Sequence, residues 1–382
     1  MDHNDPQERS TRAAWCSRRR FVRGALLGGA ALAAGLGCAR STTPTKQEGA
    51  AASKQLGVAL LGLGGYSETQ LAPALRLTRH CTLRGIVTGT PAKIEPWQKQ
   101  YAIEDRNVYD YGSLSRIADN REIDVVYVVV PTALHAKYAI MAAEAGKHVW
   151  CEKPMAMSAA ECQSIIDACK KNGVSLAVGY RMQHEPNTRT IIEYARDKPY
   201  GPITGIRAVA GDRSEGGTGW RMQRSMGGGA LYDMGVYSIN AIRYASGEEP
   251  VRVVRARQWS DRPELFREVD ESSEFELELP SGVVAYGKAS RGVQENILRV
   301  EAQRGSYQLE PMQAYDGVEG KTSDGKVLDR KVDDQQARQM DDDALAILEK
   351  RAPLVPGEEG QRDIRIVEAI IASARSGEPV RI

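Results

Sequence analysis

The sequence lacks both a long apolar segment and an excess of charge of one sign. Its leading apolar run, Gly24 to Gly37, is shorter than the roughly 20 residues that cross a bilayer and is rich in alanine and glycine. The chain has 51 Lys and Arg against 50 Asp and Glu, for a net charge of +1. We therefore expect no stable transmembrane helix and no nucleic-acid partner.

Closely spaced cysteine pairs are also lacking. Apart from Cys16 and Cys38 near the start, the cysteines are Cys81, Cys151, Cys162 and Cys169. None forms a Cys-x-x-Cys pair, so the spacing does not indicate a zinc site, and we expect no metal. Cys162 and Cys169 lie seven residues apart on one expected helix, a spacing typical of core packing.

The first 55 residues have the composition of a targeting signal followed by a polar tether. The stretch "SRRRFVRGALLGGAALAAGLGC" has a basic start, an apolar run and small residues, as cleavable signal peptides do. Arg18 and Arg19 resemble the twin-arginine signal, which exports folded proteins. Residues 1–39 are therefore expected to be a signal peptide read by the twin-arginine export machinery, and residues 40–55 a polar tether, giving a periplasmic protein. A lipid anchor on Cys38, or a leader without a transport role, remains an alternative.

From Leu56 to Val178, short apolar strands alternate with helical stretches. "LGVALL", "TLRGIVTG", "IDVVYVVVP", "GKHVWCEKP" and "VSLAVGYR" read as strands, and Ala133 to Ala145 and Ser158 to Asn172 as helices. This alternation predicts a parallel sheet covered on both faces, which is a Rossmann-type nucleotide-binding domain over residues 56–178. Ligands of such sheets bind at the carboxyl ends of the strands.

The first expected strand ends in a glycine turn. Gly62 and Gly64 match the first two glycines of a dinucleotide-binding fingerprint, and Ser67 takes the place of the third. Together with Gly65 and Tyr66, they are expected to bind the pyrophosphate at a helix N-terminus. A plain glycine turn is the alternative interpretation.

The end of the second strand has no acidic residue to hold the ribose 2′-hydroxyl of NAD. Thr88 and Gly89 occupy this turn, and Lys93 follows. A missing carboxylate removes repulsion of a 2′-phosphate and a lysine attracts it, so the expected cofactor is NADP. Lys93 as an ordinary exposed helix lysine is the alternative.

Several motifs resemble those of the Gfo/Idh/MocA oxidoreductase family, and the resemblance extends from Leu56 to Ile382. They are "VVVPTALH", "AGKHVWCEKPMAMS", "GYRMQHEP" and "GGGALYDMGVYSINAIRY". The resemblance implies that Pro131 and Glu152 contact the cofactor and that Lys153 reaches a substrate hydroxyl beside the nicotinamide. Tyr237 stands where many members have histidine, which is similar to the periplasmic glucose–fructose oxidoreductase branch.

Alcohol oxidation needs a group that takes a proton while hydride leaves. Free tyrosine has a pKa of about 10, too high for a good base at neutral pH, and a neighbouring ammonium favours the phenolate. Tyr237 is the expected base and Lys153 the ammonium. Asp233, one helical turn earlier, is expected to face the same side and to bind a sugar hydroxyl or orient Lys153. A tyrosine packed on the sheet is the alternative for Tyr237.

Four further residues are assigned to the substrate site by the resemblance alone. Arg181 and His184 follow the fifth strand, and Trp220 and Arg221 precede a glycine run. Each is expected either to contact sugar hydroxyls or to have a structural role. His135 is expected to pack rather than to catalyse.

Residues 179–382 have a different pattern. "ITGIRAVAG", "RVVRARQWS", "SSEFELELP", "GVVAYGKAS" and "ILRVEAQRG" alternate apolar and polar residues, which predicts a sheet with one buried face. The resemblance implies an α+β domain with a large open, mostly antiparallel sheet, C-terminal helices, substrate contacts on one face and homo-oligomer contacts on the other. The polar stretch from Tyr315 to Asp343 reads as a hairpin and an exposed helix start without a chemical role.

Three functions remain open at this stage. The favoured one is an NADP-dependent oxidoreductase acting on small-molecule sugars, with tightly bound NADP and ping-pong exchange between two sugars. The alternatives, both found among relatives, are an exported glycosidase that uses its nucleotide transiently and a non-catalytic sensor. The presence of both Lys153 and Tyr237 argues against the sensor.

Overall fold

A computed structural model describes residues 55–214 and 219–382. These residues belong to one compact unit, Ala52–Ile382. The predicted signal peptide and all but the last residue of the predicted tether lie outside the described residues. Within the described ranges, no helix has the length and apolar character needed to cross a membrane.

The first half of this unit is built on a parallel sheet of six strands in the order β3-β2-β1-β4-β5-β6. All six residues of β1 are buried, as expected for an apolar strand covered on both faces. The order changes direction between β1 and β4, and ligands of doubly wound sheets bind at that point. The predicted Rossmann-type sheet is confirmed. Its strands are β1 (Leu56–Leu61), β2 (Cys81–Val87), β3 (Val108–Tyr109), β4 (Val125–Val128), β5 (His148–Cys151) and β6 (Leu176–Val178).

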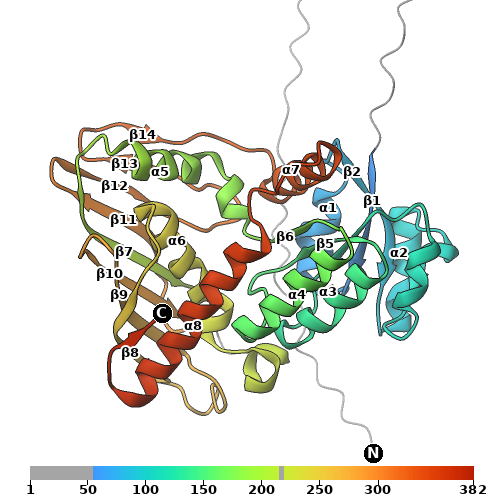
Figure 1. Cartoon of the computed structure of the whole chain (residues 1–382), viewed down its shortest axis with the longest axis horizontal. Coiled ribbons are helices and arrows are strands. Elements are labelled where there is room, and N and C mark those ends of the chain that lie inside the picture. Colours follow the sequence, from blue (N-terminus) through green and yellow to red (C-terminus); the bar gives the residue numbers. More distant parts are fainter. Residues whose placement is uncertain (1–54, 215–218) are drawn as a thin grey trace, which may run out of the picture. The chain divides into compact units, whose positions relative to one another are not determined.

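Helices cover this sheet on both sides (Figure 1). They are α1 (Ala72–Ala74), α2 (Ile94–Tyr101), α3 (His135–Glu144) and α4 (Ala159–Lys171). Helix α4 begins where the Ser158 side chain accepts a hydrogen bond from the backbone N–H of Glu161, which caps its first turn. Cys162 and Cys169 are free and buried on α4, as the core-packing interpretation predicted.

The second half contains a nine-stranded sheet in the order β14-β13-β12-β11-β7-β10-β9-β8-β15. Strands β7 and β10 run parallel and the other neighbouring pairs are antiparallel, which confirms the predicted large, mostly antiparallel sheet. Its strands are β7 (Ile203–Gly211), β8 (Arg252–Trp259), β9 (Ser272–Glu278), β10 (Val284–Ser290), β11 (Asn296–Ala302), β12 (Gly305–Leu309), β13 (Gly320–Thr322), β14 (Val327–Leu328) and β15 (Val380–Arg381).

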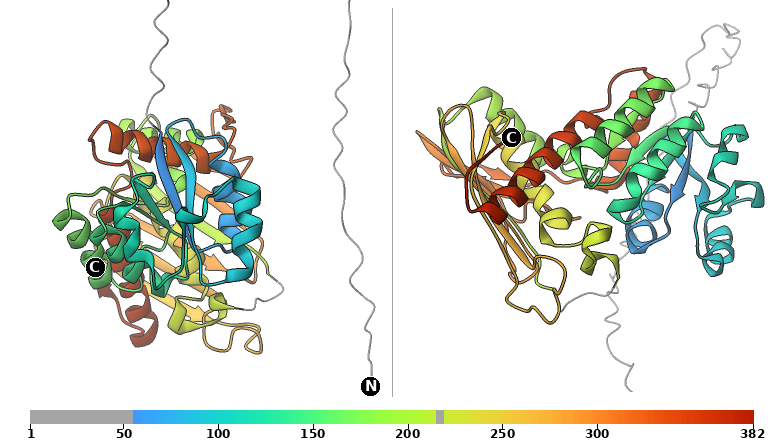
Figure 2. Two further views of the ribbon diagram at one scale, coloured as in Figure 1. Left: turned by 90° about the vertical axis from the view of Figure 1, so that its right-hand side faces the viewer. Right: turned by 60° about the horizontal axis from the view of Figure 1, so that its bottom comes forward.

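Within residues 55–214 and 219–382, the helices that pack on this large sheet lie on one face of it. They are α5 (Pro186–Asp197), α6 (Val236–Ser246) and α8 (Gly357–Ser376). The right-hand view in Figure 2 shows α6 and α8 on one side of the strands and, among the described residues, no helix on the other. The uncovered face carries charged pairs across neighbouring strands, such as Arg255 with Glu276 at 2.6 Å.

Helix α7 (Gln335–Leu348) differs from the sequence-based expectation. We expected an exposed helix start there, but Gln335, Gln336 and Ala337 are buried. Ala337, Met340 and Ala344 join the apolar cluster that contains the β1 residues. This helix therefore packs into the core beside the parallel sheet, although its sequence lies after the second sheet.

Candidate active site

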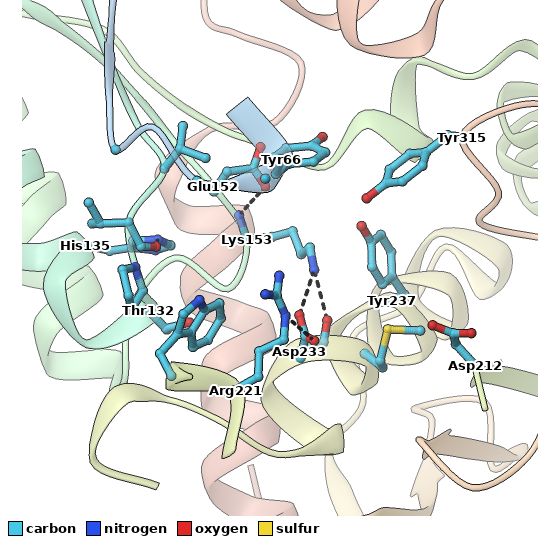
Figure 3. A pocket seen from close by; sticks show the side chains of 18 of the residues that line it. Tyr66, Thr132, His135, Glu152, Lys153, Asp212, Arg221, Asp233, Tyr237 and Tyr315 are labelled. Atoms are coloured by element: carbon cyan, nitrogen blue, oxygen red, sulfur yellow. Dashed lines mark hydrogen bonds and ion pairs between the residues drawn. The ribbon is translucent and has the colours of Figure 1, made fainter. Parts of the chain in front are cut away.

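A cavity of about 710 Å³ lies at the carboxyl ends of β1, β4 and β5 and extends to the large sheet. Figure 3 shows side chains from both halves of the unit pointing into it. The structure brings most of the predicted site residues to this one space. They are Gly62, Gly64, Gly65, Tyr66, Thr88, Lys93, Pro131, Glu152, Lys153, Arg181, Trp220, Arg221, Asp233 and Tyr237.

The glycine turn after β1 presents open backbone to the cavity. Gly62 has φ of +102°, and a Cβ there would lie 2.6 Å from the Val129 carbonyl oxygen, so only glycine fits. A Cβ at Gly64 or Gly65 would meet nothing within 4 Å. The Ser67 hydroxyl donates to the Gly62 carbonyl at 2.6 Å and fixes the turn. Such an open, rigid turn suits a pyrophosphate group.

The turn after β2 lies beside the glycine turn. Lys93 Nζ donates to the Leu63 carbonyl at 2.5 Å, so this ammonium lies at the cavity wall rather than free on the surface. The Thr88 hydroxyl accepts from the Thr90 backbone N–H at 3.1 Å. Gly89 is not among the residues that line the cavity; a Cβ there would lie 2.8 Å from the Tyr111 ring, so Gly89 permits packing instead.

Lys153 follows β5 and points toward the second half of the unit. Its Nζ donates to the Asp233 backbone carbonyl at 2.9 Å and lies 3.8 Å from Asp233 Oδ1. The same nitrogen lies 4.4 Å from the centroid of the Tyr237 ring. Burial lowers the pKa of Lys153, while Tyr237 and Glu152 act in the opposite direction. The predicted lysine, tyrosine and aspartate therefore form one cluster.

Asp233 balances several positive charges in this cluster. Its Oδ2 accepts from Arg221 Nε at 3.1 Å and also from Arg291, which follows β10. The side chains of Asp233 and Arg291 are 9% and 14% exposed, so this ion pair is largely shielded from water. Asp233 lies in a π-helical turn, Leu231–Gly235, that runs directly into α6 and thereby places Asp233 and Tyr237 in the same cavity.

Glu152 and Tyr127 form a buried hydrogen bond behind Lys153. The Tyr127 hydroxyl donates to Glu152 Oε1 at 2.7 Å. Burial raises the pKa of Glu152, while the bond from Tyr127 and the charge of Lys153 oppose this rise. Glu152 also lines the cavity and accepts from the Lys153 backbone N–H at 3.2 Å, so it fixes the start of the turn that carries Lys153.

Arg181 holds one wall of the cavity in place. Its guanidinium donates to the carbonyl oxygens of Gln313 and Ala314, the latter at 2.9 Å. It lies 4.5 Å from the Tyr315 ring centroid, and Tyr315 stacks on Tyr66 with 5.9 Å between ring centroids. Burial raises the pKa of Tyr315 to about 12. Of its two expected roles, the structure gives Arg181 contacts that fit the structural one.

His184 is buried but does not line the cavity. Its Nδ1 lies 3.5 Å from Oδ2 of Asp342 on α7, and burial lowers the pKa of the imidazole to about 4. Of its two expected roles, the contacts of His184 fit the structural one rather than a substrate contact. His135 is also buried, with ring nitrogens 2.8 Å from the carbonyl oxygens of Val130 and Pro154, as expected of a packing residue.

Sequence reasoning missed a group of cavity residues from the large sheet and the loops that follow it. Arg291 had no recognisable motif, and Tyr315 stands at the start of a stretch that we expected to have no chemical role. The one signal in the sequence for these cavity residues was a polar residue that comes directly after a strand whose end lies at the cavity. These cavity residues are Asp212, Arg291, Gln294, Asn296, Gln313 and Tyr315.

The parallel sheet, the open glycine turn and the lysine–tyrosine cluster define the class: a nucleotide-binding oxidoreductase. Residues 56–180 match the Gfo/Idh/MocA model for an oxidoreductase family with an NAD-binding Rossmann fold. Residues 188–308 match the C-terminal domain model of the same family. The chain therefore belongs to the Gfo/Idh/MocA oxidoreductase family, as its motifs predicted.

Relatives cover nearly the whole described chain. The solved aldose–aldose oxidoreductase of Caulobacter crescentus is 37% identical, with a TM-score of 0.82, covering 86% of this chain and 100% of that one. The NADP-dependent D-xylose 1-dehydrogenase of Haloarcula marismortui is 26% identical over 88% of this chain and 96% of its own. A D-xylose 1-dehydrogenase (NADP+) of Haloferax volcanii is 27% identical over 85% of this chain and 98% of its own.

Proposed function

We propose that the protein is an NADP-dependent sugar oxidoreductase that moves a hydride between a sugar hydroxyl or carbonyl carbon and the nicotinamide. The observation that carries this proposal is that the glycine turn and the Lys153–Tyr237 pair open into one cavity. The names of the relatives support it, since they describe oxidoreductases of aldoses and NADP-dependent xylose dehydrogenases.

The residues present fit NADP. Gly64 and Gly65 leave room for a pyrophosphate, and Gly62 allows the tight turn that presents them. Thr88 and Lys93 would hold the 2′-phosphate without a competing carboxylate among the cavity residues of that turn. When bound, the cofactor supplies the carbon that accepts or donates the hydride. Tyr66 and Pro131 complete the wall on this side.

Tyr237 is the group that takes the proton of the sugar hydroxyl. The Lys153 ammonium, 4.4 Å from its ring, stabilises the negative charge that develops on the phenolic oxygen. Asp233 keeps Lys153 in place through its carbonyl oxygen. Arg221 and Arg291 hold the Asp233 carboxylate, so the proton-transfer group is fixed before a substrate arrives.

The cavity wall opposite the glycine turn would bind the sugar. Polar side chains suited to hydroxyl groups line it, including Asp212, Gln294 and Asn296. Trp220 also lines it and offers an aromatic face for the apolar side of a sugar ring.

Export in the folded state accounts for how such an enzyme would obtain its cofactor outside the cytoplasm. The twin-arginine route accepts folded cargo, so NADP would be enclosed before export. Changing Arg18 and Arg19 to lysine in the full chain should then leave the protein in the cytoplasm. Periplasmic accumulation of that double variant would contradict this localisation.

The uncovered face of the large sheet is the proposed homo-oligomer contact. It carries both charge signs, with Arg207 bonded to Glu295 and Arg255 to Glu276, each at 2.6 Å. A second copy can pair with such a face. The mass of the purified protein in solution, measured by light scattering, tests this proposal, and a monomer at micromolar concentration would contradict it.

Mass spectrometry of ligands released from the purified protein, followed by a screen of aldoses and ketoses, tests the proposed function directly. We expect NADP or NADPH in the released fraction and absorbance changes at the nicotinamide band when a sugar is added. Release of nitrophenol from a nitrophenyl glycoside would support the glycosidase instead. Bound nucleotide with no turnover of any sugar would support the sensor.

A further inference from the structure

A second cluster of potential ligands lies where α7 packs against the 3-10 turn Arg181–His184. One ligand atom each from His184, Asp342 and Asp343 lies within 4.8 Å of the others. His184 is 3% and Asp343 1% exposed, so two of the three side chains are enclosed by the protein. None of the three lines the active-site cavity.

The enclosed polar atoms of this cluster are poorly satisfied. Among the described residues, His184 Nε2 and the two carboxylate oxygens of Asp343 have no hydrogen bond of good geometry, and the Gln339 amide is the one side-chain donor that acts on Asp343. The Gln339 amide, one helical turn before Asp343, donates to the Tyr127 hydroxyl at 3.3 Å. A buried polar group without a good partner is costly. Two such side chains of metal-ligand type, His184 and Asp343, lie together here, which indicates a place suited to a bound cation.

We propose that His184, Asp342 and Asp343 bind a divalent transition-metal ion of the Zn²⁺ type. An imidazole nitrogen and two carboxylate oxygens are ligands that such an ion accepts, at bond lengths of about 2.0–2.2 Å. A tetrahedral site with these bonds places its donors roughly 3.4 Å apart. Small side-chain rotations would therefore close the observed spacing, and water would complete the shell.

Asp342 sits at the outer side of this site. Its Oδ1 accepts from Arg351 Nη2 at 2.6 Å, while its Oδ2 faces His184. The side chain is 33% exposed, so it gives the ion a path from solvent. Arg189, Arg338 and Arg351 add positive charge around His184. Because these positive charges repel a cation, the ion has to be coordinated directly by the carboxylates of Asp342 and Asp343.

The site would join two parts of the chain that the active site depends on. His184 ends the short turn that begins with Arg181, and Arg181 holds the carbonyl of Ala314 beside Tyr315. Asp342 and Asp343 belong to α7, which packs into the core beside the parallel sheet. A bound ion would tie the Arg181–His184 turn to α7 and so have a structural rather than a catalytic role.

Titration of the untagged full chain with Zn²⁺ by calorimetry, after treatment with a chelator, tests this proposal. We expect one ion per chain and a rise in the melting temperature. Asp343→Asn keeps the shape of the side chain but removes its charge. It should weaken binding by at least the roughly 10- to 100-fold that loss of a residue supporting a ligand costs, because Asp343 is proposed as a ligand itself. Asp329→Asn, a loss of an exposed carboxylate elsewhere, is the matched control and should bind as the parent does.

The proposal would be overturned by a lack of saturable binding to the parent chain, or by equal affinity of the parent and Asp343→Asn for the ion. His184→Gln provides a second variant, checked for folding by circular dichroism. Titration of the parent with Co²⁺ gives a measurement that needs no variant, since a site with nitrogen and oxygen ligands produces visible absorption bands that saturate at one ion per chain. If these absorption bands do not appear, or do not saturate at one ion per chain, the proposal is likewise contradicted.

Discussion

The ammonium nitrogen of Lys153 lies 4.4 Å from the centroid of the Tyr237 ring. Lys153 follows β5 of the parallel sheet, and Tyr237 belongs to α6, which packs on β7 of the large sheet. The proposed proton-transfer pair therefore forms only when the two halves of the unit pack together. Chemistry at this site depends on how the two halves of the unit pack.

Tyr237→Phe should leave NADP bound and lower turnover by the roughly 10²–10⁴-fold typical of a lost general base. The ring stays in place beside Lys153 and only the oxygen is removed. Sugar-dependent turnover and NADP content are the measurements. Tyr232→Phe is the matched control, because its hydroxyl donates to the Met157 carbonyl at 2.7 Å and it does not line the cavity. Full turnover by Tyr237→Phe would assign the proton to another group.

Asp233→Asn should destabilise the protein by about 3 kcal/mol, because it removes the one shielded carboxylate that Arg291 and Lys153 share. The loss would appear as a lower midpoint in urea unfolding. Asp212→Asn is the control: Asp212 pairs with the same Arg291 at 3.3 Å but its side chain is 56% exposed. An exposed pair contributes about 0–1 kcal/mol. Equal effects of the two variants would show that Asp233 is not the principal counter-charge.

Thr88→Asp should shift the preference from NADP toward NAD. A carboxylate at the end of β2 repels the 2′-phosphate and offers a partner to the ribose hydroxyl, and a charge-assisted hydrogen bond contributes about 1–3 kcal/mol, or roughly 5- to 150-fold in the affinity ratio. Affinities for both nucleotides are measured. Thr88→Asn introduces a side chain of the same size as aspartate but without its charge, so this variant should keep the preference for NADP. Unchanged ratios in both variants would exclude this turn as the selector.

The pH dependence of kcat/KM should reflect the lowered pKa of Lys153. Burial favours its neutral form, so the ammonium is lost at a lower pH than in free lysine. Since the proposed mechanism needs the ammonium beside Tyr237, activity should fall as pH rises through the lowered pKa of Lys153. Lys153→Arg stays charged over this range, so whatever activity it retains should not fall there. An alkaline decline shared by both proteins would assign it to another group.

The parallel sheet could be predicted from the sequence because its signals are local. Strands such as β1 are continuous apolar runs, and the Gly62 turn is recognisable from its spacing. Strand β3 was missed because two residues, Val108 and Tyr109, carry no periodicity. The longer strands of the large sheet were found by their alternation, and β13 and β14 form the predicted hairpin. Strands β12 and β15 were missed because they are short and follow polar turns.

The rest of the site could not be predicted because it depends on contacts between distant segments. Tyr315 reaches the cavity because Arg181 binds the carbonyl oxygens just before it, and nothing in the sequence around either residue indicates that bond. Arg291 becomes a site residue only when β10 lies beside β7 and its side chain meets Asp233. Its sequence neighbours carry no motif.

The purified protein should contain NADP in near-equal amount and exchange hydride between two sugars without added nucleotide. A bacterial periplasm is not expected to hold a useful NADP pool, so an exported enzyme cannot borrow and return its cofactor. NADPH formed by oxidising one sugar then has to be reoxidised in the same cavity by reducing a second. This requires ping-pong kinetics: double-reciprocal plots at several fixed concentrations of the second sugar should be parallel. Tyr237→Phe should retain NADP but lose the exchange. Cofactor-free protein that turns over only with added NADP, or intersecting plots, would contradict this prediction.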